Sequence, residues 1–422
     1  MAGANQNLYV YKNDVFVGAL TIGAFDEFSF CYDAAYISSK AAPLSLSLPV
    51  REAAHESESV YAFFEGLLPE GEMREVLAGR VRTTSGNTSA LLAALCGECI
   101  GNIIIFTEEM QAIGYCQLPS GYQSLSRSEF EELLEPLSPT RLDAVIANRI
   151  SLTGAQAKIS LFSASADPAC SDWSLPFGLA ASNHILKPQS ARFPLLVENE
   201  AFCMQLAGEC GIETAYTSIL QARSPVLVST RFDRTRATDG SVTRLFQEDV
   251  CQILGLLSSW KYQEYHGPGF AQVSDVIARY VTDVIPAITQ LLRRALFNFL
   301  IGNCDAHGKN FSLIARPDSG FALSPAYDLL STTYYPELST CLAMSIGREF
   351  DRNKVTRDDF LVLAQQIGVD RGRLAKEFQI LLSSINEKAP EVANRLSTDG
   401  FPQVEAIAQH IICEANRFEG LL

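Results

Sequence analysis

The chain has 422 residues, which is long enough for two or three domains with separate hydrophobic cores. Hydrophobic residues make up 47% of the sequence, as expected of a globular protein. The formal net charge is −15 and the isoelectric point is near 4.9, which argues against unaided nucleic-acid binding, since neutralising phosphates requires clustered Lys and Arg. No apolar run reaches the ~18 residues of a membrane span, and the first residues do not have the pattern of a signal peptide.

The eleven cysteines are scattered along the chain. In a chain without a secretion signal they are expected to be reduced thiols, which places the protein in a cytoplasm. Cys96 and Cys99 have the spacing of a metal or redox pair, but no second pair of this spacing accompanies them. A structural role is therefore the favoured interpretation.

The first part of the chain, residues 8–106, predicts a small mixed domain. It opens with a β-hairpin over 8–20, whose turn contains Asn and Asp. Strict alternation of Leu with Ser and Pro over 43–49 predicts a half-buried strand. The other elements expected here are helices over 60–68 and 88–96 and a strand over 101–106. Nothing in this part indicates catalysis.

In the next part, Ser128 and Glu131 predict a capping box for a helix that ends at Leu134. Residues 149–162 predict two strands joined by a loop of small residues, and the backbone N–H groups of such a loop can approach phosphate closely. The loop has a single glycine, so it is not a G-x-G-x-x-G motif. Lys187 ends an expected buried strand, where an ammonium group needs an anionic partner; the alternative is a solvated lysine on an edge strand.

A helix over 197–210 and a strand over 226–233 follow, which completes the order of elements of a kinase N-lobe. From Arg244 onward the pattern is mainly helical. Helices are expected over 247–254, 275–281 and 286–300, then one capped by Thr356 and Asp359, and two more before the end.

One stretch, 297–313, leads from an apolar helix through polar and small residues into an apolar strand. Asp305 and Asn310 have the separation of the Asp and Asn in the catalytic loop of protein kinases, where one orients the acceptor hydroxyl and the other holds a metal ion. Asp328 follows in a later loop and adds a second carboxylate. Two carboxylates and a carboxamide suit Mg²⁺. Taken alone, however, Asp and Asn at this spacing more often cap a turn.

Several segments, in order and over nearly the whole chain, together resemble the HipA family, bacterial serine/threonine kinases that are the toxins of toxin–antitoxin pairs. The segments that carry the resemblance are 43–49, 151–158, 184–187, 231–234, 244–249, 261–262, 267–269, 302–312 and 327–328.

The resemblance implies an α+β fold: a protein-kinase-like two-lobed architecture with an extra N-terminal β-rich subdomain and an all-α C-lobe. The implied boundaries are 1–107 for the accessory subdomain, 108–235 for the N-lobe with its phosphate loop, and 236–422 for the helical C-lobe.

The resemblance also implies the site. Asp305 is the expected catalytic base, Asn310 and Asp328 the Mg²⁺ ligands, and Ser151 an autophosphorylation site whose modification silences the enzyme. The residues expected to bind ATP are Thr153, Gly154, Ala155, Gln156, Ala157, Lys158, Lys187, Thr230, Arg231, Phe232, His307, Gly308, Lys309, Asn310, Tyr327 and Asp328.

The sequence departs from the family pattern at some positions. Thr230 stands where glutamate is usual, Ala157 where a charged residue is frequent, and Cys304 precedes Asp305 in place of the His-Arg pair of eukaryotic kinases. None of these changes removes the base or a metal ligand. Residues 358–370 contain no basic residue, so contact with DNA is expected only indirectly, through a helix-turn-helix antitoxin similar to HipB.

The implied function is that of an ATP- and Mg²⁺-dependent serine/threonine-protein kinase, the toxin of a type II toxin–antitoxin system, which phosphorylates a translation component and inactivates itself. Two alternatives remain at this point. One is a catalytically silent subunit that only binds the antitoxin, which the presence of Lys187, Asp305, Asn310 and Asp328 disfavours. The other is a kinase for a non-protein acceptor.

Overall fold

The computed structural model describes residues 6–23, 26–95, 97–135, 138–148, 156–165, 172–316 and 319–422. The chain divides into two compact units, of which the first comprises Met1–Pro188 and Asp233–Ser258 and the second Gln189–Phe232 and Ser259–Leu422. The chain therefore passes three times from one unit to the other.

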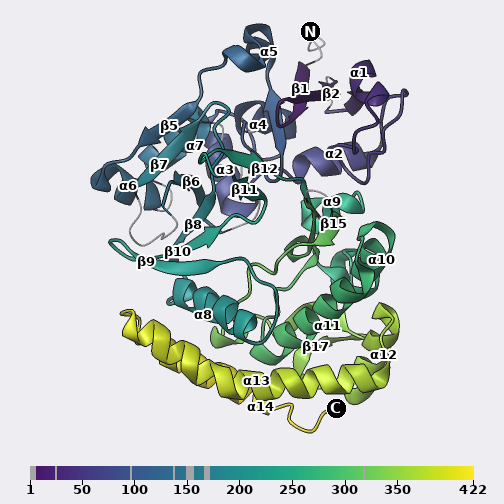
Figure 1. Ribbon diagram of the computed structural model, residues 1–422, viewed down its shortest axis with the longest axis vertical. Coiled ribbons are helices and arrows are strands. Elements are labelled where there is room, and N and C mark those ends of the chain that lie inside the picture. Colours follow the sequence, from purple (N-terminus) through teal and green to yellow (C-terminus); the bar gives the residue numbers. More distant parts are fainter. Residues whose placement is uncertain are drawn as a thin grey trace. The chain divides into compact units, whose positions relative to one another are not determined.

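The first unit begins with an antiparallel sheet in the order β3-β2-β1-β4 (purple and blue in Figure 1). The predicted hairpin is present. Lys12 pairs with Val15 across a two-residue turn, and Asn13 there has a φ of +52°, a conformation that Asn tolerates better than most residues. In chain order up to residue 113 the elements are β1 (Gln6–Lys12), β2 (Val15–Ile22), β3 (Phe28–Tyr32), α1 (Ala34–Ser38), α2 (Glu58–Glu65), α3 (Gly71–Arg80), α4 (Thr88–Leu95), β4 (Ile103–Phe106) and α5 (Glu108–Ile113).

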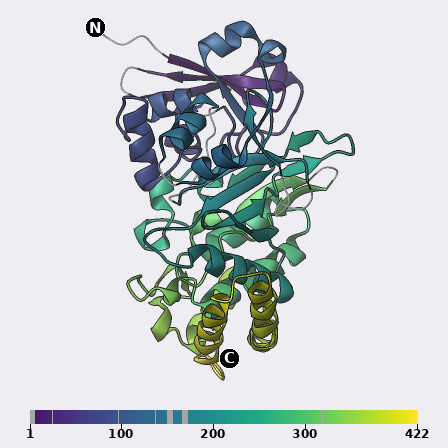
Figure 2. The same cartoon turned by 90° about the vertical axis from the view of Figure 1, so that its left-hand side faces the viewer.

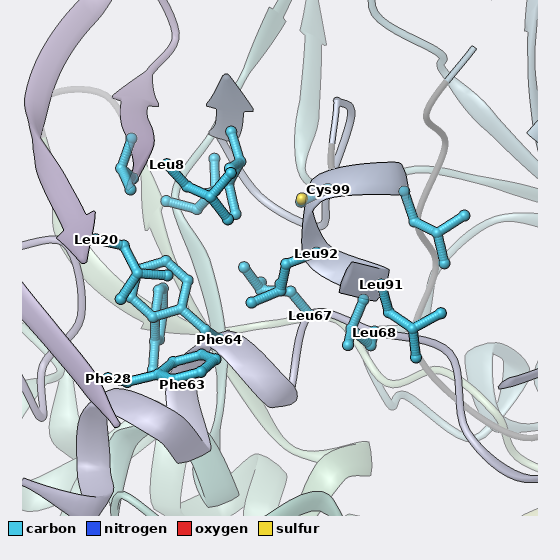
Figure 3. Packing of buried hydrophobic residues seen from close by; sticks show 14 of the residues in the cluster. Leu8, Leu20, Phe28, Phe63, Phe64, Leu67, Leu68, Leu91, Leu92 and Cys99 are labelled. Atoms are coloured by element: carbon cyan, nitrogen blue, oxygen red, sulfur yellow. The ribbon is translucent and has the colours of Figure 1, made fainter. Parts of the chain in front are cut away.

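One hydrophobic core joins this sheet to helices α2 and α4 (Figure 3). Leu8 and Leu20 come from the sheet, Phe63 and Phe64 from α2, and Leu92 from α4. Leu8, Leu20, Phe64 and Leu92 are fully buried, and full burial of such a side chain contributes about 1.5–3 kcal/mol. The core explains why this part of the chain is rich in Leu and Phe and poor in candidate catalytic groups.

Residues 43–49 form a turn, so the strand predicted there is wrong. Leu44 and Leu48 are fully buried, but between them the chain bends around the carboxyl group of Glu248. The Oγ of Ser45 is hydrogen-bonded to that carboxyl group, and the N–H of Leu46 donates to its other oxygen at 2.9 Å. A tight turn that buries two leucines produces the same alternation as a strand, and periodicity alone does not separate the two.

Burial raises the pKa of Glu248 to about 8, against the ordinary value of 4.5. The folded protein therefore keeps a proton on this group at pH values where the unfolded chain has lost it. The contribution of Glu248 to stability is complete below about pH 4.5 and is lost as the pH rises through 8.

We expect Glu248→Gln to remove this pH dependence, because the neutral amide can accept from Leu46 and donate to Ser45 without ionising. Thermal unfolding of both proteins at a series of pH values measures the effect. The melting temperatures should agree near pH 5, and the variant should become the more stable protein towards pH 8. A constant difference across this range would contradict the assignment.

A second sheet of the first unit has the order β5-β7-β6-β8 and is antiparallel throughout. The capping box of α6 is formed by Ser126 and Glu129, two residues before the predicted Ser128 and Glu131. The strand predicted before the small-residue loop lies outside the described residues. The elements here are β5 (Gly121–Ser124), α6 (Arg127–Leu134), α7 (Pro139–Ala147), β6 (Ile159–Ser163), β7 (Trp173–Phe177) and β8 (His184–Pro188), and, after the second crossing, β11 (Arg234–Arg236), β12 (Val242–Arg244), β13 (Gln247–Asp249) and α9 (Val250–Ile253).

A buried charge network ties the accessory part of the first unit to the segment after residue 232. The guanidinium group of Arg234 is bonded to the carboxylates of Asp233 at 2.8 Å and Glu98 at 3.2 Å, and all three side chains are at most 3% exposed. Arg234 also donates to the backbone oxygens of Gly101 and Ser182. Residues before and after position 107, where the predicted accessory subdomain ends, therefore lie in the same compact unit.

The second unit contains the long helices α13 and α14, which lie side by side (yellow in Figure 2). The predicted Thr356–Asp359 capping box opens α12. The described part of this unit is predominantly helical, but it also carries three antiparallel hairpins, β9–β10, β14–β15 and β16–β17. Its elements are α8 (Leu196–Glu209), β9 (Thr217–Gln221), β10 (Pro225–Thr230), α10 (Phe270–Tyr280), α11 (Val284–Ile301), β14 (Ser312–Arg316), β15 (Gly320–Leu323), β16 (Cys341–Ile346), β17 (Glu349–Asp351), α12 (Arg357–Ile367), α13 (Arg371–Thr398) and α14 (Val404–Asn416).

Helix α11 is, among the described residues, the one helix with the length and apolar composition of a membrane span. In the fold, 61% of its residues are buried against the rest of the protein, as in the central helix of a globular lobe. It leads directly into the stretch that carries Asp305.

Candidate active site

The loop that carries Asp305 starts where α11 ends, at Gly302. This glycine has a φ of +73°, and a Cβ atom there would lie 2.1 Å from the Oγ1 of Thr333. The helix can therefore end at this position only with glycine. The N–H of Asp305 then donates to the side chain of Asn303 at 3.1 Å, and the Asp305 side chain is exposed.

Asn310 and Asp328 lie side by side, although they come from different loops. The Nδ2 of Asn310 donates to the Oδ2 of Asp328 at 3.2 Å, and the Oδ1 of Asn310 accepts from the N–H of His307 at 3.0 Å. Asp328 has a φ of +62°, which is rare for a residue other than glycine, and such conformations cluster at functional sites. A carboxylate beside a carboxamide is an oxygen donor set of the kind Mg²⁺ prefers, so these two residues fit the predicted metal.

Tyr327 holds the Asp328 loop in place. Its hydroxyl group donates to the backbone oxygen of Lys309 at 2.6 Å and is hydrogen-bonded to Ser312 at 2.6 Å. Just before it, the backbone oxygen of Ser324 accepts from the buried guanidinium group of Arg294, whose pKa burial lowers to about 10. Arg294 belongs to α11 and Ser312 to β14, which are the elements on either side of the catalytic loop.

Among the residues of the second unit expected to bind ATP, Phe232 contacts Tyr327. The ring of Phe232 stacks on the ring of Tyr327, with centroids 5.4 Å apart and an interplanar angle of 29°. Thr230 ends β10, and its N–H donates to the backbone oxygen of Tyr216 at 2.9 Å, while the Arg231 side chain is buried. The stacked pair presents aromatic surface of the kind that contacts a purine.

The first unit carries the other predicted nucleotide contacts. Lys187 lies on β8, as predicted, and is only 7% exposed, which excludes the alternative of a solvated edge-strand lysine. Gln156, Ala157 and Lys158 are half-buried ahead of β6, and the Nε2 of Gln156 is a buried donor that no group in the described part of the chain accepts from. An orphaned donor within the expected phosphate loop fits an anionic ligand. Ser151, Thr153, Gly154 and Ala155 lie outside the described residues.

Tyr262 is a residue of this site to which the sequence assigned no role. Its hydroxyl group donates to the Oδ1 of Asp305 at 2.9 Å, and its ring meets the ring of His307 edge-on at 5.5 Å. The pair Lys261–Tyr262 belongs to the resembling segments, but no spacing in the sequence indicates that residue 262 contacts residue 305.

Comparisons with known proteins identify the family. Residues 150–392, more than half of the chain, match the HipA-like C-terminal domain, and residues 8–106 match the HipA N-terminal domain. The chain belongs to the HipA family. The serine/threonine-protein kinase toxin HipA of Shewanella oneidensis is 30% identical, with 91% of this chain and 89% of that protein covered. A Sinorhizobium fredii protein named as a kinase, Y4mE, is 36% identical, with 91% of each chain covered.

The same fold is present in a solved HipA structure. The complex of the Shewanella oneidensis MR-1 toxin–antitoxin system, with HipA, HipB and operator DNA, has a chain that matches at a TM-score of 0.81 and 26% identity, covering 98% of both chains. The predicted α+β, kinase-like fold with its N-terminal subdomain is thereby confirmed, as are the HipA family and the class of enzyme, a serine/threonine-protein kinase of toxin–antitoxin systems.

Proposed function

We propose that this HipA-family kinase transfers the γ-phosphoryl group of ATP, with Mg²⁺, to a serine or threonine of a protein, with Asp305 as the base. The observation that carries the proposal is the geometry of the second unit, in which Asn310 lies against Asp328 and the loop of Asp305 is clamped by its neighbours. In the reaction the acceptor oxygen attacks the γ-phosphorus atom, the bond to the β-phosphate oxygen breaks, and Asp305 takes the hydroxyl proton.

Asn310 and Asp328 would hold Mg²⁺, which neutralises charge on the phosphates. Lys187 and the loop Thr153–Lys158 would bind the phosphates of ATP, and Thr230–Phe232, His307–Asn310 and Tyr327 would bind the rest of the nucleotide. Phosphoryl transfer needs little covalent help, so positioning and charge neutralisation are the tasks these groups perform.

Asn310→Ala and Asp328→Ala are each expected to weaken binding of Mg²⁺-ATP about tenfold or more, because each removes an oxygen ligand that water replaces poorly. Calorimetric titration with ATP at fixed Mg²⁺ measures the effect, and a Mg²⁺ titration of each variant shows whether the metal requirement has moved. Wild-type affinity and metal dependence in both variants would place the metal elsewhere.

Ser151 is proposed as the site of self-inactivation. A phosphoserine adds a charge of about −1.5 to −2 to a loop that is proposed to bind the phosphates of ATP. Electrostatic repulsion would then weaken nucleotide binding. We expect incubation with Mg²⁺-ATP to place phosphate on Ser151 and to abolish ATP binding, and Ser151→Ala to remove the self-inactivation. Phosphate only at other residues, or full ATP affinity of protein phosphorylated at Ser151, would exclude this role.

The partners proposed are a helix-turn-helix antitoxin similar to HipB and a protein substrate in the translation machinery, in the cytoplasm. The solved HipA–HipB–DNA complex with a chain of this fold supports the antitoxin as partner. The net charge of −15 supports DNA contact through that antitoxin rather than through this chain.

A further inference from the structure

An exposed aspartate on a loop rotates freely about its side-chain bonds unless another group holds it. Asp305 is such an aspartate, and the Tyr262 hydroxyl, from a segment 43 residues earlier in the chain, donates to its Oδ1 at 2.9 Å. A carboxylate that is held through one oxygen keeps a fixed orientation towards an acceptor hydroxyl.

The segment of Tyr262 is built to hold this hydroxyl still. The backbone oxygen of Tyr262 accepts from the N–H groups of Tyr265 at 3.0 Å and Gly267 at 2.9 Å. The turn is so tight that a Cβ atom on Gly267 would lie 2.4 Å from the backbone oxygen of Trp260 and 2.6 Å from that of Tyr262. Glycine at position 267 is therefore required for the chain to close around Tyr262.

The same segment is fastened to the catalytic loop and to β16. The N–H of Gly308 donates to the backbone oxygen of Lys261 at 3.1 Å, and the Tyr262 ring packs edge-on against the His307 ring. The side chain of Gln263 accepts from the N–H of Ser345 at 2.8 Å. Three contacts from consecutive residues thus fix the distance between the hydroxyl group and Asp305.

We propose that Tyr262 is a positioning residue for phosphoryl transfer, which orients the carboxylate of Asp305 through Oδ1. The inference rests on the proposed function, since it takes Asp305 as the base. Tyr262 stays protonated throughout the reaction and donates the same hydrogen bond before and after transfer.

A hydroxyl group hydrogen-bonded to the catalytic carboxylate also has the geometry of an acceptor. The rigid turn distinguishes the two roles. A substrate hydroxyl must move into the site and, once phosphorylated, move out again. The Tyr262 backbone, in contrast, is held in a tight turn by the N–H of Gly267, and its ring packs on the ring of His307. The structure therefore assigns Tyr262 as a fixed donor and not as a substrate.

The test is Tyr262→Phe, which removes the hydroxyl group and keeps the ring. The control is Tyr265→Phe, which removes an exposed hydroxyl group three residues away on the same turn. The assay follows labelled phosphate from ATP into a phosphatase-treated bacterial extract. We expect kcat to fall about 10- to 100-fold, because a small misplacement of a reacting group costs up to about 10²-fold, with the KM for ATP and the melting temperature unchanged. Tyr265→Phe should behave as wild type.

Combining Tyr262→Phe with Asp305→Asn separates positioning from a general structural role. If Tyr262 acts through the carboxylate, its loss should change the residual single-turnover rate of Asp305→Asn less than twofold. An equal fold-loss in both backgrounds, or a normal rate for Tyr262→Phe beside an inactive Asp305→Asn, would overturn the inference. Phosphate found on Tyr262 by mass spectrometry would overturn it too. A fully active Asp305→Asn would instead overturn the proposed function.

Discussion

Asp305→Asn is expected to abolish phosphoryl transfer while the protein stays folded and binds ATP. The amide has the shape of the carboxylate, and its oxygen can still accept from the Tyr262 hydroxyl and so keep the loop in place. The amide cannot take the proton of the acceptor hydroxyl group, however, and removal of a general base typically costs about 10²- to 10⁴-fold in rate. The side chain is exposed, so little change in stability is expected.

Phosphoproteomics after brief expression, comparing wild type with Asp305→Asn, measures this effect in cells and identifies the substrate. Labelled-phosphate transfer with purified protein gives the rate, and calorimetry with ATP verifies that the nucleotide still binds. Near-normal turnover of Asp305→Asn would mean that the aspartate only caps its turn, and the proposed mechanism would fail.

Arg234→Met is expected to cause a large loss of stability in the first unit. Removing this guanidinium group takes the cation at 2.8 Å away from the buried carboxylate of Asp233 and leaves Glu98 with the longer contact to Arg244 at 3.5 Å. Breaking a buried ion pair from one side costs about 3–5 kcal/mol. The backbone oxygens of Gly101 and Ser182 would lose their donor as well.

Arg236→Met is the matched control, because Arg236 lies two residues away on β11 and is exposed, with one hydrogen bond to the backbone of Ala164. Urea unfolding followed by circular dichroism, with the same slope assumed for both variants, gives the two free energies. The control should lose less than about 1 kcal/mol. Equal losses in the two variants would show that the buried network does not stabilise the unit.

The sequence by itself determined the family, the kinase-like fold and the general position of most elements. The ordered segments that resemble HipA carried the family and the fold. Local signals placed single elements: an Asn-Asp turn for the first hairpin and the Thr356–Asp359 capping box for α12. Such signals involve a few residues that are close together in the sequence, so they predict an element without knowledge of its tertiary contacts. Where the signal was equally local but ambiguous, as in the Leu alternation over 43–49, the prediction of a strand was wrong.

Only the tertiary structure decided what distant residues do to one another. Glu248, which lies 203 residues from Ser45 in the sequence, bends 43–49 into a turn, and the Tyr262 hydroxyl contacts Asp305 from another segment. Arg234 is buried between two acids that the sequence does not place together, and Asn310 meets Asp328 across two loops. In each case the hydrogen bond or charge pair forms because folding brings together two groups that are distant along the chain. Periodicity and spacing do not indicate such contacts, because they describe the neighbours of a residue along the chain and not its neighbours in space.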